Sequence, residues 1–288
     1  MTLIGNILAD GVAYAMILFM ISVGMSMTMG LMRLVNMAHG SFAMIGGFLT
    51  VAIVARFGWR FEIGAALAIL VVALVAVPIE RWLIRRFYRR PPLDQMLMTM
   101  GIMFVSIAAI EATFGSTTTA IAMPGYMTGS ADLGFRLFPR HRLAVIVLGV
   151  MVILALWLVV ERSTFGIKVR AAVDDPAIAQ AVGIDTSRIH VIAFAAGAAL
   201  AALGGIAGAE LLPMESSYAA KYLVVILAVV AVGGHGTLFG SFLAALLLGL
   251  VETAAKYLVP DLSSIAFFLT MFLVLLARPQ GLMGRGAH

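Results

Sequence analysis

The side chains best able to do chemistry in this chain are polar groups set inside apolar sequence. Asn36, His39 and Ser41 follow one another closely between two apolar segments. Polar side chains are costly in hydrocarbon and usually face protein or a water-filled cavity. Neighbouring glycines allow a helix to break, and broken helices are tolerated where they line a transport route. We expect these three residues to lie in a broken helix beside a translocation pathway. The alternative is an interfacial loop in which Arg33 reaches the lipid headgroups.

A second polar break occurs late in the chain, at Gly234, His235 and Gly236. Its sequence His-Gly-Thr-Leu-Phe resembles His39-Gly-Ser-Phe, which hints at an internal repeat too short to establish. We assign these three residues to the same candidate pathway. The GxxxG spacings of Gly204 with Gly208 and of Gly236 with Gly240 predict close helix packing.

Motifs for catalysis and cofactor binding are absent from the sequence. There is no GxxxxGK[ST] phosphate loop, no HExxH and no GxSxG, so the chain should not hydrolyse ATP through such a loop or act as a common protease or esterase. It has no cysteine, which excludes Cys-based metal or redox sites. We expect no catalytic residue, no metal site and no cofactor in this chain. Scarce mid-span carboxylates also argue against a proton- or sodium-coupled carrier.

Composition places the chain in a lipid bilayer. Of its 288 residues, 62% are hydrophobic and 11% are charged, and the mean hydropathy is +1.08. Soluble domains carry about 25% charged residues. The sequence therefore predicts an all-α, polytopic transmembrane bundle that forms a single domain over residues 1–288. The net charge of +5 is concentrated in loops, which indicates membrane orientation and not nucleic-acid binding.

A membrane span needs roughly 20 mostly apolar residues. Some candidates are short, so eight full spans with broken or re-entrant pieces and nine spans are both compatible with the sequence. The candidates are residues 8–29, 41–55, 63–80, 95–114, 142–160, 190–212, 221–233, 237–256 and 262–277.

Loop cations set the expected orientation. The arginines of 81–90 and the cations of 162–188 lie two crossings apart, and both groups are assigned to the cytoplasm. The segment 115–141 then falls outside, although Arg136, Arg140 and Arg142 weigh against this. With nine spans the N-terminus is external and the C-terminus cytoplasmic.

The one long polar stretch, residues 161–189, carries the signals of a short ordered helix. Asp174 and Asp175 can cap a helix whose first position is Pro176. Gly183 stands where the helix would need a left-handed residue after its end. Such a helix, with an apolar face of Ala177, Ile178, Ala181 and Val182, could dock into a partner, or lie against its own bundle or the membrane surface.

Four segments together resemble the LivH-type permeases of branched-chain amino acid ABC importers. They are GLMRLVNMAHGSFAMIGGF (30–48), ERSTFGIKVRAAVDDPAIAQAVGIDTSRI (161–189) with the small-residue helix after it, AVVAVGGHGTLFGSFLAALLLGLVE (228–252) and ARPQGLMGR (277–285). They cover nearly the whole chain in the family's order.

The resemblance implies that the polar stretch is a cytoplasmic ATPase-coupling loop. Its expected coupling residues are Arg162, Gly166, Arg170, Asp174, Asp175, Pro176 and Gly183. The implied partners are a second homologous permease (LivM-like), two cytoplasmic ATPases (LivG- and LivF-like) that use ATP and magnesium, and a periplasmic binding protein. The implied location is the bacterial inner membrane.

The resemblance does not fix the substrate. Ser41 stands where many members of the family have glutamate, and family members also serve urea, amides and aromatic acids. Rivals from other classes are a stand-alone secondary carrier or channel, an intramembrane enzyme and a structural scaffold.

Overall fold

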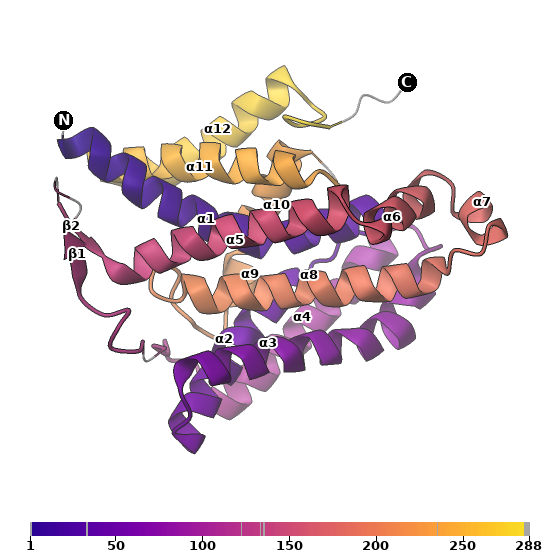
Figure 1. Cartoon of the computed structure of the whole chain (residues 1–288), viewed down its shortest axis with the longest axis horizontal. Helices are drawn as coiled ribbons and strands as arrows, with labels where there is room; N and C mark the ends of the chain where they lie inside the picture. The colour runs from indigo at the N-terminus through magenta and orange to yellow at the C-terminus, as the bar shows by residue number, and fades with distance from the viewer. Residues whose placement is uncertain are drawn as a thin grey trace.

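The computed structural model describes residues 2–32, 34–121, 123–132, 134, 136–234 and 236–284. Arg33, His235 and Arg285 lie outside the described residues. Figure 1 shows long helices running side by side, with a small hairpin at one end and α7 at the other. The helices are α1 (Thr2–Met32), α2 (His39–Phe57), α3 (Phe61–Pro78), η1 (Ile79–Leu83), η2 (Ile84–Phe87), α4 (Pro92–Phe114), α5 (Arg140–Glu161), α6 (Thr164–Asp174), α7 (Pro176–Ala181), α8 (Thr186–Gly208), α9 (Tyr218–Lys221), α10 (Leu223–Gly233), α11 (Leu238–Leu258), η3 (Pro260–Leu262) and α12 (Ser263–Ala277).

Within the part of the chain that the structure describes, eight helical segments are long and apolar enough to cross a membrane. The candidate at 221–233 corresponds to a shorter apolar helix, Tyr218–Gly233. The predicted all-α polytopic bundle is confirmed, in the version with eight full-length helices and a shorter piece. The composition did not predict the antiparallel hairpin of β1 (Ser130–Asp132) and β2 (Leu137–Pro139).

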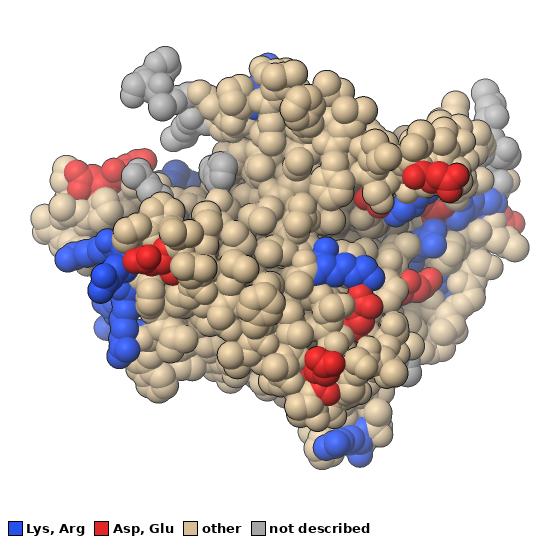
Figure 2. Space-filling model, turned by 180° about the vertical axis from the view of Figure 1, so that it is seen from behind, with Lys and Arg blue, Asp and Glu red and all other residues tan. Residues whose placement is uncertain are grey.

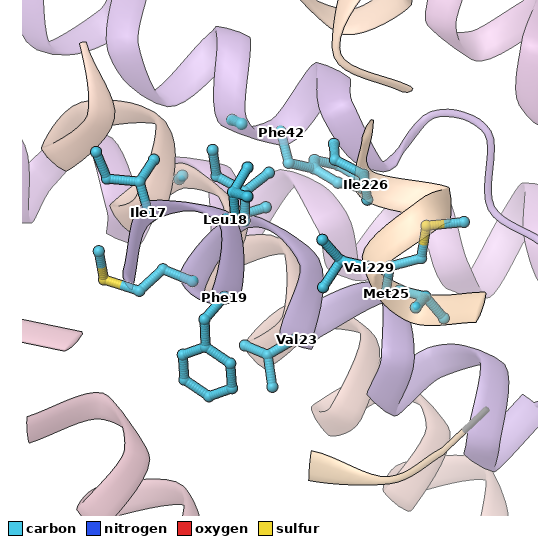
Figure 3. Packing of buried hydrophobic residues seen from close by; sticks show 14 of the residues in the cluster. Ile17, Leu18, Phe19, Val23, Met25, Phe42, Ile226 and Val229 are labelled. Atoms are coloured by element: carbon cyan, nitrogen blue, oxygen red, sulfur yellow. The ribbon is translucent and has the colours of Figure 1, made fainter. Parts of the chain in front are cut away.

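Helix α1 forms the centre of the bundle. Its side chains from Ala13 to Met25 are buried, whereas few residues of α5 and α12 are buried. In Figure 3, Val229 of α10 lies beside Met25 of α1, and Ile226 of α10 lies beside Phe42 of α2. A helix that is apolar all round belongs inside a bundle of other helices.

Glycines let the central helices approach backbone to backbone. A Cβ added to Gly24 of α1 would lie 2.3 Å from the carbonyl oxygen of Gly197 of α8. A Cβ on Gly205 of α8 would lie 2.3 Å from the carbonyl oxygen of Ala43 of α2. The GxxxG glycines Gly204 and Gly208 likewise meet α1, which confirms their predicted packing role. Small residues at such crossings provide the close contact that holds helices together in lipid.

Helix α2 begins inside the bundle and not at its surface. Nε2 of His39 lies 2.9 Å from the carbonyl oxygen of Ile21. Ile21 lies about 16 Å along α1 from the end of that helix at Met32, because an α-helix rises roughly 1.5 Å per residue. A Cβ on Gly40 would lie 2.9 Å from the carbonyl oxygen of Ala219. The starts of α2 and α9 therefore meet in the interior.

The two groups of loop cations share one end of the bundle, as expected. Tyr88, at the end of the arginine-rich segment, packs its ring 5.4 Å from that of His190, at the start of α8. We call this the α7 end, and the opposite end, with residues 115–139 and 209–217, the hairpin end. Figure 2 shows charged side chains mainly toward the two ends, with a wide surface of other residues between them.

At the hairpin end, buried Asp10 holds three segments together. It accepts hydrogen bonds from Arg136 at 3.0 Å and from Tyr257 at 2.5 Å, and it pairs with Arg142. Partial burial lowers the pKa of Arg136, but the hydrogen bonds to Asp10 more than offset this, and the net shift is upward. Arg136 and Arg142 thus have a structural role that is independent of membrane orientation.

Replacing Gly24 with alanine should destabilise the protein by about 3 kcal/mol, because its Cβ meets backbone that cannot rotate away. The matched control is Gly101→Ala in α4, where an added Cβ has nothing within 4 Å. There, alanine should be neutral or stabilising, since it favours a helix over glycine. The melting temperatures of the two purified variants test this prediction. Equal melting temperatures would contradict the close backbone contact between α1 and α8 at Gly24.

Replacing Asp10 with asparagine should lower the free energy of unfolding by about 2–3 kcal/mol, because hydrogen bonds to a charged group are lost. Asp132→Asn is the control, since Asp132 is an exposed aspartate at the same end of the bundle and accepts a hydrogen bond only from the nearby Gly134 N–H among the described residues. Thermal unfolding followed by tryptophan fluorescence measures both variants. A D10N melting temperature equal to that of D132N would show that the cluster adds nothing.

Candidate functional site

The loop at the α7 end contains two short helices, each with a side-chain cap. Ser163 precedes α6 and accepts a hydrogen bond from the Gly166 N–H at 3.3 Å. Asp175 precedes α7 and accepts from the N–H groups of Ala177 and Ile178 at 2.9 and 3.0 Å. Pro176 occupies the first turn of α7, as predicted. Of the two expected cap residues, Asp175 binds the helix N-terminus, and Asp174 ends α6.

The end of α7 is equally well defined. Gly183 has a φ of 87°, the left-handed conformation that its position predicted. Its N–H donates to the Gln180 carbonyl at 3.0 Å, and the Ile184 N–H donates to the Ala179 carbonyl at 2.9 Å. This pair of bonds is the Schellman arrangement, which satisfies the last carbonyl groups of a helix.

Helix α6 is tied directly to the end of α5. A Cβ on Gly166 would lie 1.8 Å from the Val160 carbonyl oxygen, so only glycine fits. The Arg170 guanidinium donates to the same carbonyl at 2.7 Å and lies 3.6 Å from the Glu161 carboxylate. Arg162 stacks over the Trp157 ring at 4.8 Å. Three of the expected coupling residues therefore attach the loop to a membrane-length helix.

The apolar face of α7 is not covered by its own bundle. Ile178 is 64% exposed and Val182 is 71% exposed, and Ala177 and Ala181 are also exposed. Ala179, on the other side, is buried. Figure 1 shows α7 projecting beyond the ends of the long helices.

A cavity of about 590 Å³ connects this loop with the bundle. Its lining includes Val173 and Asp174 of α6, Trp157 of α5, Phe19 of α1 and Gly236 before α11. The polar loop and the second glycine break therefore border one space at the α7 end.

The first candidate pathway segment is broken and buried, as predicted. Residues 34–38 are not helical, and Asn36, His39 and Ser41 are each at most 1% exposed. The Asn36 side chain accepts from the Ala38 N–H at 3.1 Å. The interfacial-loop alternative depends on Arg33, which lies outside the described residues. A role in translocation stays a prediction.

The second candidate segment packs tightly at the α7 end. Gly234 and Gly236 have φ values of 93° and 78°. A Cβ on Gly236 would lie 2.7 Å from the Gly30 Cα, and one on Gly234 would lie 2.6 Å from the Gly284 N. Close backbone packing therefore requires both glycines.

Two polar residues near the first break were not singled out from the sequence. The Thr99 hydroxyl of α4 accepts from the Met37 N–H at 3.1 Å and so supports the non-helical stretch. Tyr218 is fully buried at the start of α9. Their only sequence signal is a polar group within an apolar helix, and that signal does not reveal a partner distant in the chain.

Among the described residues, several buried polar atoms have no protein hydrogen-bond partner. They include Nδ2 of Asn36, Oγ of Ser41 and the Tyr218 hydroxyl. Buried polar atoms are rarely left without a partner. The interior therefore keeps hydrogen-bonding capacity near the meeting point of α2 and α9.

Known proteins resemble this chain over nearly its full length. It is 27% identical to the high-affinity branched-chain amino acid transport system permease protein LivH of Escherichia coli K12, over 96% of this chain and 94% of the relative. It is 28% identical to BraD of Pseudomonas aeruginosa, over 97% of this chain and 94% of the relative. A probable LivH of Methanocaldococcus jannaschii is 24% identical, with coverage of 96% and 92%.

Comparison with solved structures supports the fold alone. A chain of PsaBC from Streptococcus pneumoniae in complex with Fab aligns with a TM-score of 0.50 and 14% identity, covering 93% of this chain and 89% of that chain. The family model described as "Branched-chain amino acid transport system / permease component" matches residues 7–275. The chain therefore belongs to this family and is a membrane-spanning permease subunit of an ABC importer.

Proposed function

We propose that this chain forms, as a single domain over residues 1–288, one half of a translocation pathway for branched-chain or related amino acids. A second, LivM-like permease would supply the other half, and a periplasmic binding protein would deliver the substrate. Two cytoplasmic LivG- and LivF-like ATPases would use ATP and magnesium, and the complex would lie in the bacterial inner membrane. The names of the relatives support the substrate class.

One observation carries the assignment of the coupling loop. Helix α7 is capped at both ends and projects from the bundle, yet its exposed face is apolar. An exposed apolar patch of this kind marks an interaction site more often than a free surface. We assign this face, within residues 161–189, to a groove on an ATPase subunit.

The anchoring of α6 supports a mechanical role for the loop. ATP binding would close the ATPase pair and change the separation of the two docked loops. Gly166 and Arg170, both against the Val160 carbonyl, would pass this displacement to α5. A ligand can shift a conformational equilibrium only by the difference between its binding affinities for the two states. The closed ATPase pair would thus favour one conformation of the bundle over the other.

The interior break is the proposed pathway segment of this chain. Asn36, Ser41 and Tyr218 offer polar atoms there that lack protein partners among the described residues. His39 lies between Asn36 and Ser41 in the sequence. Opening of the bundle would expose these atoms to the substrate. Gly234 and Gly236 would act at the cytoplasmic mouth, where Gly236 borders the same cavity as the coupling loop.

Replacing Ile178 with aspartate should reduce amino acid uptake at least ten-fold and prevent co-purification of the ATPases, because a charge would enter an apolar groove. Folding should be unaffected, since the side chain is exposed. Ile167→Asp is the control: Ile167 is 60% exposed but lies on α6. Uptake by I178D at the wild-type rate, or an equal loss in I167D, would contradict docking through α7.

Replacing Gly183 with proline should also abolish uptake, because proline cannot adopt a positive φ and lacks the N–H that bonds to Gln180. Gly183→Asn should retain most activity, since asparagine tolerates the left-handed region. Uptake is measured in proteoliposomes holding all subunits, alongside the amount of permease inserted. If G183P and G183N transport equally, the shape of the α7 end is not required.

A further inference from the structure

A second cavity, at the hairpin end, has the composition of a small-molecule site. It encloses about 500 Å³, within the range of pockets that bind small ligands. Residues 118–121, 123 and 127–129 form one wall, and the start of α5 and the segment after α8 form the other. Its lining residues include Ile121, Met123, Met127, His141, Glu210 and Pro213.

Glu210 brings a carboxylate to this cavity. Its side chain is 42% exposed, and one oxygen, Oε2, lies 2.7 Å from Nδ1 of the buried His141. This contact has the distance of an ion pair but not the geometry of a hydrogen bond, since Nδ1 of His141 has no hydrogen-bond partner among the described residues. A carboxylate can accept about four hydrogen bonds, so Glu210 keeps its acceptor capacity. The partly exposed carboxylate therefore lines the cavity beside the buried His141 ring.

The other lining groups define the kind of ligand that would fit. Ile121, Met123, Met127 and Pro213 give an apolar wall, and methionine adapts to side chains of different shape. A metal ion is a poorer candidate, because within the described part of the chain no three His, Cys, Asp or Glu residues gather as a metal site. A primary ammonium group, which has three donors, joined to an aliphatic body matches both features.

The position of the cavity also fits a site on the route inward. Thr119, on its wall, donates its N–H to the Met214 carbonyl at 2.8 Å. The chain then runs from Pro213 to α9, whose Ala219 touches Gly40 at the interior start of α2. The cavity therefore lies where the chain segment that leads from Pro213 to α9 begins, and this segment enters the bundle.

We propose that this cavity binds the amino acid substrate on the extracytoplasmic side before it enters the bundle. Glu210 accepts hydrogen bonds from the α-ammonium group, His141 is a positioning residue, and the apolar wall holds the aliphatic side chain. The proposal rests on the function proposed above and adds a specific site to it.

Equilibrium binding of radiolabelled leucine to the assembled permease–ATPase complex, without the binding protein, tests this site. The wild-type complex should bind leucine, and Glu210→Gln should weaken binding at least ten-fold, as expected for loss of a hydrogen bond to a charged group. Glu111→Gln, an exposed glutamate at the same end that does not line the cavity, should bind as the wild type does. Leucinol, which keeps the ammonium group, should compete, whereas 4-methylpentanoate, which lacks it, should not.

Three results would overturn the proposal: no leucine binding to the wild-type complex, equal binding by E210Q, or competition by 4-methylpentanoate as strong as that by leucinol. Uptake by the complete system with its binding protein is measured in parallel. If the complete system takes up leucine but the complex without the binding protein does not bind it, the proposed function stands and the proposed site is wrong. If E210Q binds leucine normally but no longer responds to the binding protein, Glu210 receives a group of that protein and the site assignment falls.

Discussion

In a bilayer, apolar side chains gain little by moving from lipid to protein, so an apolar bundle depends on close contact between backbones. In this protein the decisive contact is the crossing of α1 and α8 at Gly24 and Gly197, where neither position has room for a Cβ. Helix α8 meets α2 in the same way at Gly205. Because α1 is enclosed by its neighbours, these crossings set where α2 can begin, and with it the depth of the interior break.

Glycine also determines how the loop at the α7 end meets the bundle. Gly166 brings α6 against the last turn of α5, and Arg170 fastens it there through the same Val160 carbonyl. Beyond this attachment, the caps of α7 define its ends while its apolar face remains uncovered. The loop is therefore fixed to the membrane helices at one side and free to receive a partner at the other. The family is one of transport permeases that work with ATPases, which agrees with this division.

Features determined by local chemistry were predictable from the sequence. Composition and span length indicated the helical bundle, and Asp175, Pro176 and Gly183 have the roles that their residue types indicated. Features that join distant segments were not. Asp10 and Arg136 are separated by 126 residues, and no local pattern links them. The hydrogen bond from the Met37 N–H to the Thr99 hydroxyl also joins distant segments, so the sequence does not predict it.

Steric constraints also account for residues whose types suggested chemistry. Gly234 and Gly236 were predicted to form part of a polar break. Their surroundings require glycine, because Gly234 packs against Gly284 and Gly236 packs against Gly30. Their part in translocation stays a prediction. A sequence contains the glycine but not the backbone that approaches it, and only the folded chain distinguishes a packing role from a functional one.

Site-specific cross-linking at α7 tests the central claim, that this helix joins the membrane bundle to an ATPase. The chain has no cysteine, so Val182→Cys creates a single reactive site on the exposed face of α7. In inverted membrane vesicles holding the complete transporter, a short photoactivatable maleimide at this position should give a covalent product with an ATPase subunit. ATP analogues should change its yield. Cross-links to lipid or to the permease alone, in vesicles where the ATPases are bound, would contradict the account.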